Sequence, residues 1–136
     1  MSEISRFRAF LSGRNEVPPV RTNASGNAVL QVNQAGDRIT FRLVVRNISA
    51  VTQAHIHLGR RDANGPVVAF LFGPSRFGIT VRRGVVRGTL TRSDLVGPLA
   101  GRSISDLVRE IRRGNTYINV HTIGRPNGEV RGQIVR

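Results

Sequence analysis

Apolar and polar residues alternate over many short segments, and this alternation constrains the fold more than any other feature of the sequence. In the segment RITFRLVVRN, Arg38–Asn47, the apolar positions that share one side are Ile39, Phe41, Leu43 and Val45. Successive side chains of a β-strand point to opposite faces, so a period of two predicts a strand with one buried face.

Similar alternation predicts further strands at Ser5–Leu11, Ala24–Asn33, Thr52–Leu58, Ile79–Arg82, Val85–Leu90, Thr116–Thr122 and Glu129–Val135. The segment PVVAFLF, Pro66–Phe72, is apolar throughout, which predicts a strand covered on both faces. Turn signals such as PNG separate these runs. About eight short strands predict an all-β fold, a single-domain antiparallel β-sandwich or Greek-key barrel that spans residues 1–136.

One segment departs from the alternation and predicts a single short helix near residues 103–113. In SISDLVREIRRG, Ser103 and Asp106 have the spacing of a capping box, and a glycine follows the last basic residues. An apolar stripe on this helix would pack on the sheet. We expect the core to include Phe41, Leu43, Ile56, Val68, Phe70, Ile118 and Val120.

The chain carries a net charge of +13, and all 21 of its basic residues are arginine. Arginine stays charged at any working pH and pairs bidentately with carboxylates and phosphates. The longest arginine runs are pairs, at Arg60–Arg61, Arg82–Arg83 and Arg112–Arg113. Such scattered charge predicts weak attraction to polyanions at low salt, mostly lost near physiological ionic strength.

Cysteine is absent, which excludes a disulfide scaffold and a thiolate metal site. The N-terminal segment MSEISRFRAF lacks the apolar core of a signal peptide, and no apolar run predicts a transmembrane helix. The sequence also lacks a nucleophile elbow, a phosphate-binding loop and a cysteine nucleophile. These observations favour a binding module over an enzyme, and they assign neither a compartment nor an oligomeric state.

Two of the three histidines stand one residue apart in QAHIHLG, and the third lies in YINVHT. On a strand, His55 and His57 share a face with Gln53, and His121 shares a face with Asn119. The aliphatic residues of both segments fall on the opposite faces. We therefore expect the three imidazoles on the outer face of the sheet, away from the core.

If the two strands are neighbours, the three rings can converge on one ion at about 2.0–2.1 Å from each nitrogen. Nitrogen ligands without thiolate suit Cu(II) or Zn(II), and Gln53, Asn119 or Glu129 could orient the rings. Affinity should then fall as the pH drops through roughly 6.5. Alanine at an outward histidine should abolish binding and barely change stability. The alternative is three separate rings, each bonded to water or a neighbour.

The assembled segments resemble the CHRD (chordin-type) domain family along nearly the whole chain. The segments that carry the resemblance are LSGRNEVPPVRTNASGNA, QAHIHLG, NGPVVAFLF, GTLTRSDLVGPL and YINVHTIGRPNGEVRGQI. The family occurs in bacterial, often exported, proteins and in chordin, an extracellular antagonist of growth factors. The resemblance implies a β-sandwich module, and it assigns no catalytic residues.

A fainter similarity connects AHIHLG and INVHT to the copper-binding segments of Cu/Zn superoxide dismutase. It implies copper ligation by His55, His57 and His121, and an anion-guiding role for Arg125 or Arg131. The chain lacks that family's bridging histidine, zinc ligands and disulfide cysteines. Three functions therefore stay open: a CHRD-type binding module with a Cu or Zn site, a copper-only dismutase-like redox protein, and a binder of anionic polymers or nucleic acid.

Overall fold

The computed structural model describes residues 5–136 and contains seven strands and one α-helix. The strands are β1 (Ser5–Ser12), β2 (Ser25–Val32), β3 (Ile39–Leu58), β4 (Val67–Phe72), β5 (Ile79–Leu90), β6 (Thr116–Thr122) and β7 (Val130–Gln133). The helix α1 spans Ile104–Arg112, and three short 3-10 turns are η1 (Gly13–Asn15), η2 (Arg92–Asp94) and η3 (Gly97–Leu99). The prediction of an all-β domain with one short helix is confirmed.

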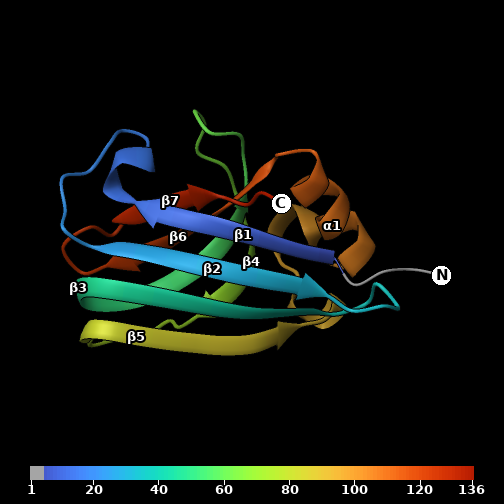
Figure 1. Cartoon of the computed structure of the whole chain (residues 1–136), viewed down its shortest axis with the longest axis horizontal. Helices are drawn as coiled ribbons and strands as arrows, with labels where there is room; N and C mark the ends of the chain where they lie inside the picture. The colour runs from blue at the N-terminus through green and yellow to red at the C-terminus, as the bar shows by residue number, and fades with distance from the viewer. Residues whose placement is uncertain (1–4) are drawn as a thin grey trace.

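All strand pairings are antiparallel, and five strands close into a barrel in the order β1–β2–β3–β6–β7. The pairing of Ser12 with Arg131 joins β1 to β7 and completes the ring. Strand β3 also pairs with β5 along its first half and with β4 along its second half. Of the two predicted architectures, the structure is therefore the barrel, with two additional strands beside β3 (Figure 1).

Strand β3 is one bent strand of 20 residues, whereas its sequence predicts two separate strands. Asn47 and Ala50 have φ angles of 53° and 56°, and the register with β5 shifts between Ile48 and Val51. Such an irregularity bends a strand and lets one segment serve two parts of a barrel. Strand β5 likewise joins two predicted strands into one.

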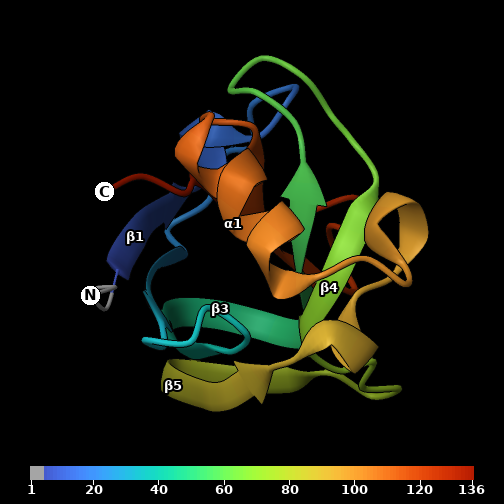
Figure 2. The ribbon, with the colours of Figure 1, turned by 90° about the vertical axis from the view of Figure 1, so that its right-hand side faces the viewer.

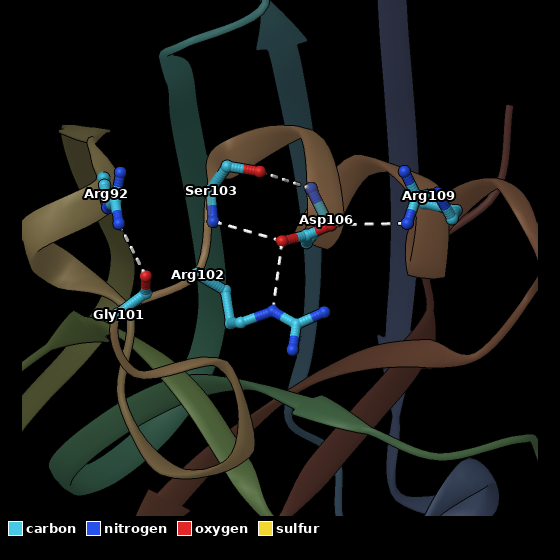
Figure 3. Close-up of polar contacts among 6 residues, drawn as sticks. All are labelled: Arg92, Gly101, Arg102, Ser103, Asp106 and Arg109. Atoms are coloured by element: carbon cyan, nitrogen blue, oxygen red, sulfur yellow. Dashed lines mark hydrogen bonds and ion pairs between the residues drawn. The ribbon is translucent and has the colours of Figure 1, made fainter.

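Helix α1 begins where the sequence predicts it, and it closes one end of the barrel (Figure 2). The Ser103 hydroxyl accepts a hydrogen bond from the Asp106 amide, and the Asp106 carboxylate accepts one from the Ser103 amide (Figure 3). This reciprocal pair satisfies two amides that the first turn leaves unbonded. The helix buries Ile104, Leu107, Val108 and Ile111 against the core.

The apolar core fills the barrel, and six of the seven predicted core residues are buried in it. The exception is Phe70, which is 41% exposed, so its prediction is wrong. Strand β4 is buried at Val68, Ala69 and Leu71 but not at Phe70, so it is not covered on both faces along its whole length. The Phe70 ring lies instead against the His55 ring, with 4.3 Å between the centroids.

Candidate metal centre

The three histidines lie on two adjacent strands, as the sequence predicts. Strand β3 pairs with β6 so that Gln53 lies opposite His121, His55 opposite Asn119, and His57 opposite Tyr117. The histidines lie on the face of the sheet that points away from the barrel core. Ile56 and Ile118, which are paired with each other, lie on the opposite face, in the core. The prediction that the histidines are in phase on this face agrees with the structure.

This outer face is covered, a feature that the alternation of residues does not indicate. His55, His57 and His121 are 4%, 7% and 8% exposed. Every residue of β6 is buried, so both faces of that strand are covered. Loops provide the cover, because backbone oxygens at Gly65 and Pro126 lie within hydrogen-bonding distance of His57 and His121.

Arg131 holds the loop between β3 and β4 over the histidines. Its guanidinium donates hydrogen bonds to the backbone oxygens of Arg60 and Ala63 and to the side-chain oxygen of Asn64, at 2.6–2.9 Å. It also lies 3.5 Å from the centre of the Tyr117 ring. A planar cation with several donors suits this combination of ring face and acceptors.

The ring nitrogens of the three histidines converge. One nitrogen from each ring can be chosen so that all three lie within 4.8 Å of one another. The ring centroids are 4.8 Å apart for His55 and His121, 5.5 Å for His55 and His57, and 6.0 Å for His57 and His121. Two nitrogens bound to one ion lie at most about 4.2 Å apart. Small ring movements would therefore bring all three within reach of one ion.

Hydrogen bonds to backbone carbonyl oxygens indicate which nitrogen carries the proton in two of the three rings. His57 Nδ1 lies 2.9 Å from the Gly65 oxygen, and His121 Nδ1 lies 2.8 Å from the Pro126 oxygen. A carbonyl oxygen accepts hydrogen bonds and never donates them, so both Nδ1 atoms carry the proton. In the neutral rings, Nε2 of His57 and Nε2 of His121 are therefore unprotonated.

His55 is oriented the other way round. Its Nε2 lies 3.0 Å from Gln53 Oε1, an oxygen that accepts, so this nitrogen carries the proton and Nδ1 does not. The unprotonated Nδ1 lies 3.2 Å from the unprotonated Nε2 of His121. His57 Nε2 is buried without a hydrogen-bond partner among residues 5–136. With these tautomers, the three unprotonated nitrogens face one buried space.

Asn119 adds a fourth electron-pair donor to this cluster. Its side-chain oxygen lies 2.9 Å from His121 Nε2. A Cβ built on Gly128 would be 2.6 Å from Asn119 Nδ2 and 2.5 Å from Glu16 Oε2, so both atoms lie next to this glycine. Glu16 is only 5% exposed, and its Oε2 has no hydrogen-bond partner in the part of the chain that the structure describes.

Burial controls the charge of these groups. Burial and the neighbouring His121 and His57 lower the pKa of His55 to about 3, and burial lowers the pKa of His57 and His121. All three rings are therefore neutral at pH 7, the form that coordinates metals. Burial also raises the pKa of Glu16 to about 7, although the positive charge of Arg131 and the Asn119 side chain act to lower it.

The other predicted site residues lie in different surroundings. Gln53 and Asn119 contact the histidines, as expected. The Glu129 carboxylate instead accepts hydrogen bonds from the hydroxyls of Thr22 and Thr122. Arg125 is exposed, whereas the guanidinium of Arg131 is buried and donates to loop oxygens, an arrangement unsuited to attracting anions from solvent.

Sequence reasoning missed Glu16 and the two carbonyl acceptors. Glu16 stands in NEVPPV, which indicates only a turn, and its approach to Asn119 depends on how that turn folds over the sheet. The acceptors at Gly65 and Pro126 are backbone atoms, which carry no residue-type signal. The one available signal was the glycine and proline content of the two loops next to the histidine strands.

Fold and site together define a small antiparallel β-barrel domain with a buried polar layer that contains three histidines. A model of the CHRD domain family matches residues 7–134, nearly the whole chain. The chain therefore belongs to the CHRD domain family, as the sequence resemblance implied. Comparison with curated proteins gives no significant match. In residues 5–136, the helix is too short and too polar to cross a membrane.

Proposed function

We propose that this CHRD domain is a metal-binding module in which His55, His57 and His121 hold one Cu(II) or Zn(II) ion. The single observation that carries the proposal is the set of oxygen atoms that face the outer nitrogens of the three rings. Each ring donates its one N–H to an oxygen outside the cluster, at Gln53, Gly65 and Pro126. Oxygen acceptors on the outer nitrogens are the arrangement that orients histidine ligands toward a metal.

A proton on His55 Nδ1 could be donated to His121 Nε2, but it would leave His55 Nε2 without a proton 3.0 Å from Gln53 Oε1 unless the Gln53 amide turned over. A proton on His121 Nε2 costs more. A proton on His121 Nε2 would either charge a buried ring, or leave Nδ1 without a proton 2.8 Å from the Pro126 oxygen. Burial makes the charged ring unfavourable. The other tautomer is unfavourable because the lone pair of Nδ1 would face the lone pairs of the Pro126 oxygen. A cation bound to the three nitrogens removes the repulsion and also satisfies Nε2 of His57.

The donor set supports copper or zinc over magnesium or calcium. Imidazole nitrogen suits Cu(II) and Zn(II), whereas the harder ions prefer carboxylate, carbonyl and water oxygens. Three protein ligands leave one position of a tetrahedral ion open for water or another ligand. The geometry favours binding over dismutation, because the guanidinium of Arg131 is already bonded to loop oxygens and Arg125 is exposed in a loop.

The proposal is tested by elemental analysis of protein purified without a histidine tag or chelator, followed by titration with Cu(II) and Zn(II). We expect one ion per chain, and loss of binding in His121→Gln. A matched control is Thr116→Val on the same strand, because Thr116 is buried and its hydroxyl has no partner among residues 5–136. Binding that survives in His121→Gln, or is absent from the native chain, would reject the metal site.

A further inference from the structure

The barrel carries a second feature, a sheet face rich in arginine, on strands β1, β2, β3 and β5. These strands lie side by side, and no other element of the described chain covers their outer side (Figure 1). The strand registers align their outward residues in rows that cross the sheet. Six outward residues are arginine, and we call them the arginine face: Arg6, Arg8, Arg42, Arg46, Arg83 and Arg87.

This face brings together arginines that are far apart in the sequence. One row runs from Arg8 through Val29 and Arg42 to Arg87. Another row places Arg46 directly opposite Arg83. In the linear sequence these arginines are scattered, since register across strands is not visible there. The fold instead places six of them on one surface.

No acidic side chain balances this charge within the described chain. The four strands contain no Asp or Glu, and the ion pairs formed by residues 5–136 all lie around helix α1. Like charges directly opposite each other across a strand pair destabilise a sheet, and this occurs twice, at Arg42 with Arg87 and at Arg46 with Arg83. An external anion would remove this repulsion.

Exposed apolar side chains lie among the arginines. Phe10 is 69% exposed, Val29 42% and Val85 39%, and the registers place all three on the same face. Phosphate or sugar polymers gain little from aliphatic side chains. Single-stranded nucleic acid needs a series of aromatic side chains for stacking, whereas Phe10 is the one aromatic residue among the outward positions of these strands. A lipid interface accepts arginine, phenylalanine and valine together.

We infer that the arginine face is a docking surface for an anionic lipid bilayer. The guanidinium groups pair with phosphate headgroups, and Phe10 and the two valines enter the interfacial region. This inference is independent of the metal site, because the histidines lie on the second half of β3 and on β6, outside the rows that form the arginine face.

Sedimentation with vesicles of phosphatidylcholine, alone or mixed with phosphatidylglycerol, tests the inference at physiological ionic strength. The native chain should bind the mixed vesicles and leave the neutral ones. The double variant Arg42→Gln/Arg87→Gln should bind about 30-fold more weakly, because each arginine near an anionic surface contributes roughly a factor of five. Circular dichroism would check that every variant is folded.

Two matched controls distinguish vesicle binding through the arginine face from general attraction by a chain with net charge +13. Arg61→Gln/Arg125→Gln removes the same charge from exposed loop positions and should change binding far less. Phe10→Ala should weaken binding, whereas Phe77→Ala, at a position 84% exposed outside the four strands, should not. Equal losses in face and loop variants would overturn the inference, as would face-dependent binding to duplex DNA without binding to vesicles.

Discussion

His55 Nδ1 and His121 Nε2 face each other 3.2 Å apart across the β3–β6 pair, and the hydrogen bonds on the far side of each ring leave both atoms unprotonated. Two lone pairs at this distance in a buried site repel each other unless a cation or a proton lies between them. The hydrogen bonds on the outer nitrogens favour the cation. The facing nitrogens are therefore the proposed position of the metal ion.

The stability of the metal-free protein should respond to pH through two opposing sets of groups. The histidine pKa values are lowered from 6.5 in the folded protein, so the unfolded chain binds more protons below that pH and stability falls as the pH falls. The pKa of Glu16 is raised from 4.5 in the unfolded chain to about 7 in the folded protein. Its contribution to folding stability is therefore fully present below about pH 4.5 and is lost as the pH rises through 7.

Glu16→Gln isolates the second contribution, since glutamine resembles the protonated acid. The variant should be more stable than the native chain at pH 8, by up to about 3 kcal/mol, and should match it near pH 4. Urea unfolding at a series of pH values measures the difference. A constant difference across that range would show that Glu16 does not titrate as the structure indicates.

Arg131→Lys should destabilise the protein by about 2 kcal/mol or more, because lysine cannot reach all the acceptors that the guanidinium serves. Those acceptors are the oxygens of Arg60, Ala63 and Asn64. The loop should then open and become sensitive to trypsin after Arg60 or Arg61, which mass spectrometry detects. Arg125→Lys, at an exposed position, is the control. A protected loop in Arg131→Lys would contradict the role of Arg131 as its anchor.

Gly128→Ala should destabilise the protein by about 1–3 kcal/mol, whereas Gly124→Ala in the same loop should have little effect. Gly128 has a φ of 120°, and its added Cβ would press on Glu16 and Asn119. An added Cβ at Gly124 meets nothing within 4 Å. Chemical denaturation of the two variants compares them directly. Equal stability would mean that the loop moves aside without cost.

Phe41→Ala should cost about 3–5 kcal/mol, as expected for a packed ring, and Phe70→Ala at most about 1.5 kcal/mol. Phe41 is 8% exposed, and its ring occupies the space left by Gly88 on the paired strand β5. Phe70 contacts His55 but remains 41% exposed. Melting temperatures of the two variants rank the costs, and the reverse order would contradict the assigned faces.

The alternation of residues predicted the strands and the shared face of the histidines, because both depend on a local period of two. It did not predict the bend of β3, since Asn47 and Ala50 adopt positive φ without a glycine that would mark the position. The prediction that Phe70 lies in the core came from a continuous apolar run, which does not reveal which side of the strand remains open.

The burial of the histidine face could not be predicted from the strands, since it depends on how two loops fold over it. The loop between β3 and β4 is held there by hydrogen bonds from Arg131, 67–71 residues further along the chain. This burial changes two expectations from the sequence. Alanine at His57 or His121 should cost stability, because the carbonyls of Gly65 and Pro126 would lose buried donors. Proton competition for the metal should set in below 6.5, because burial lowers the histidine pKa values.

Long-range ¹H–¹⁵N spectra of the histidine rings during a Zn(II) titration test the metal site most directly, since the chain has only three histidines. Before zinc is added, the spectra should show His57 and His121 protonated at Nδ1 and His55 protonated at Nε2. At one equivalent, the resonances of His55 Nδ1, His57 Nε2 and His121 Nε2 should shift together to metal-bound positions, while the opposite nitrogens keep their protons. Resonances that do not change with zinc, or a shift confined to one ring, would contradict a shared three-histidine site.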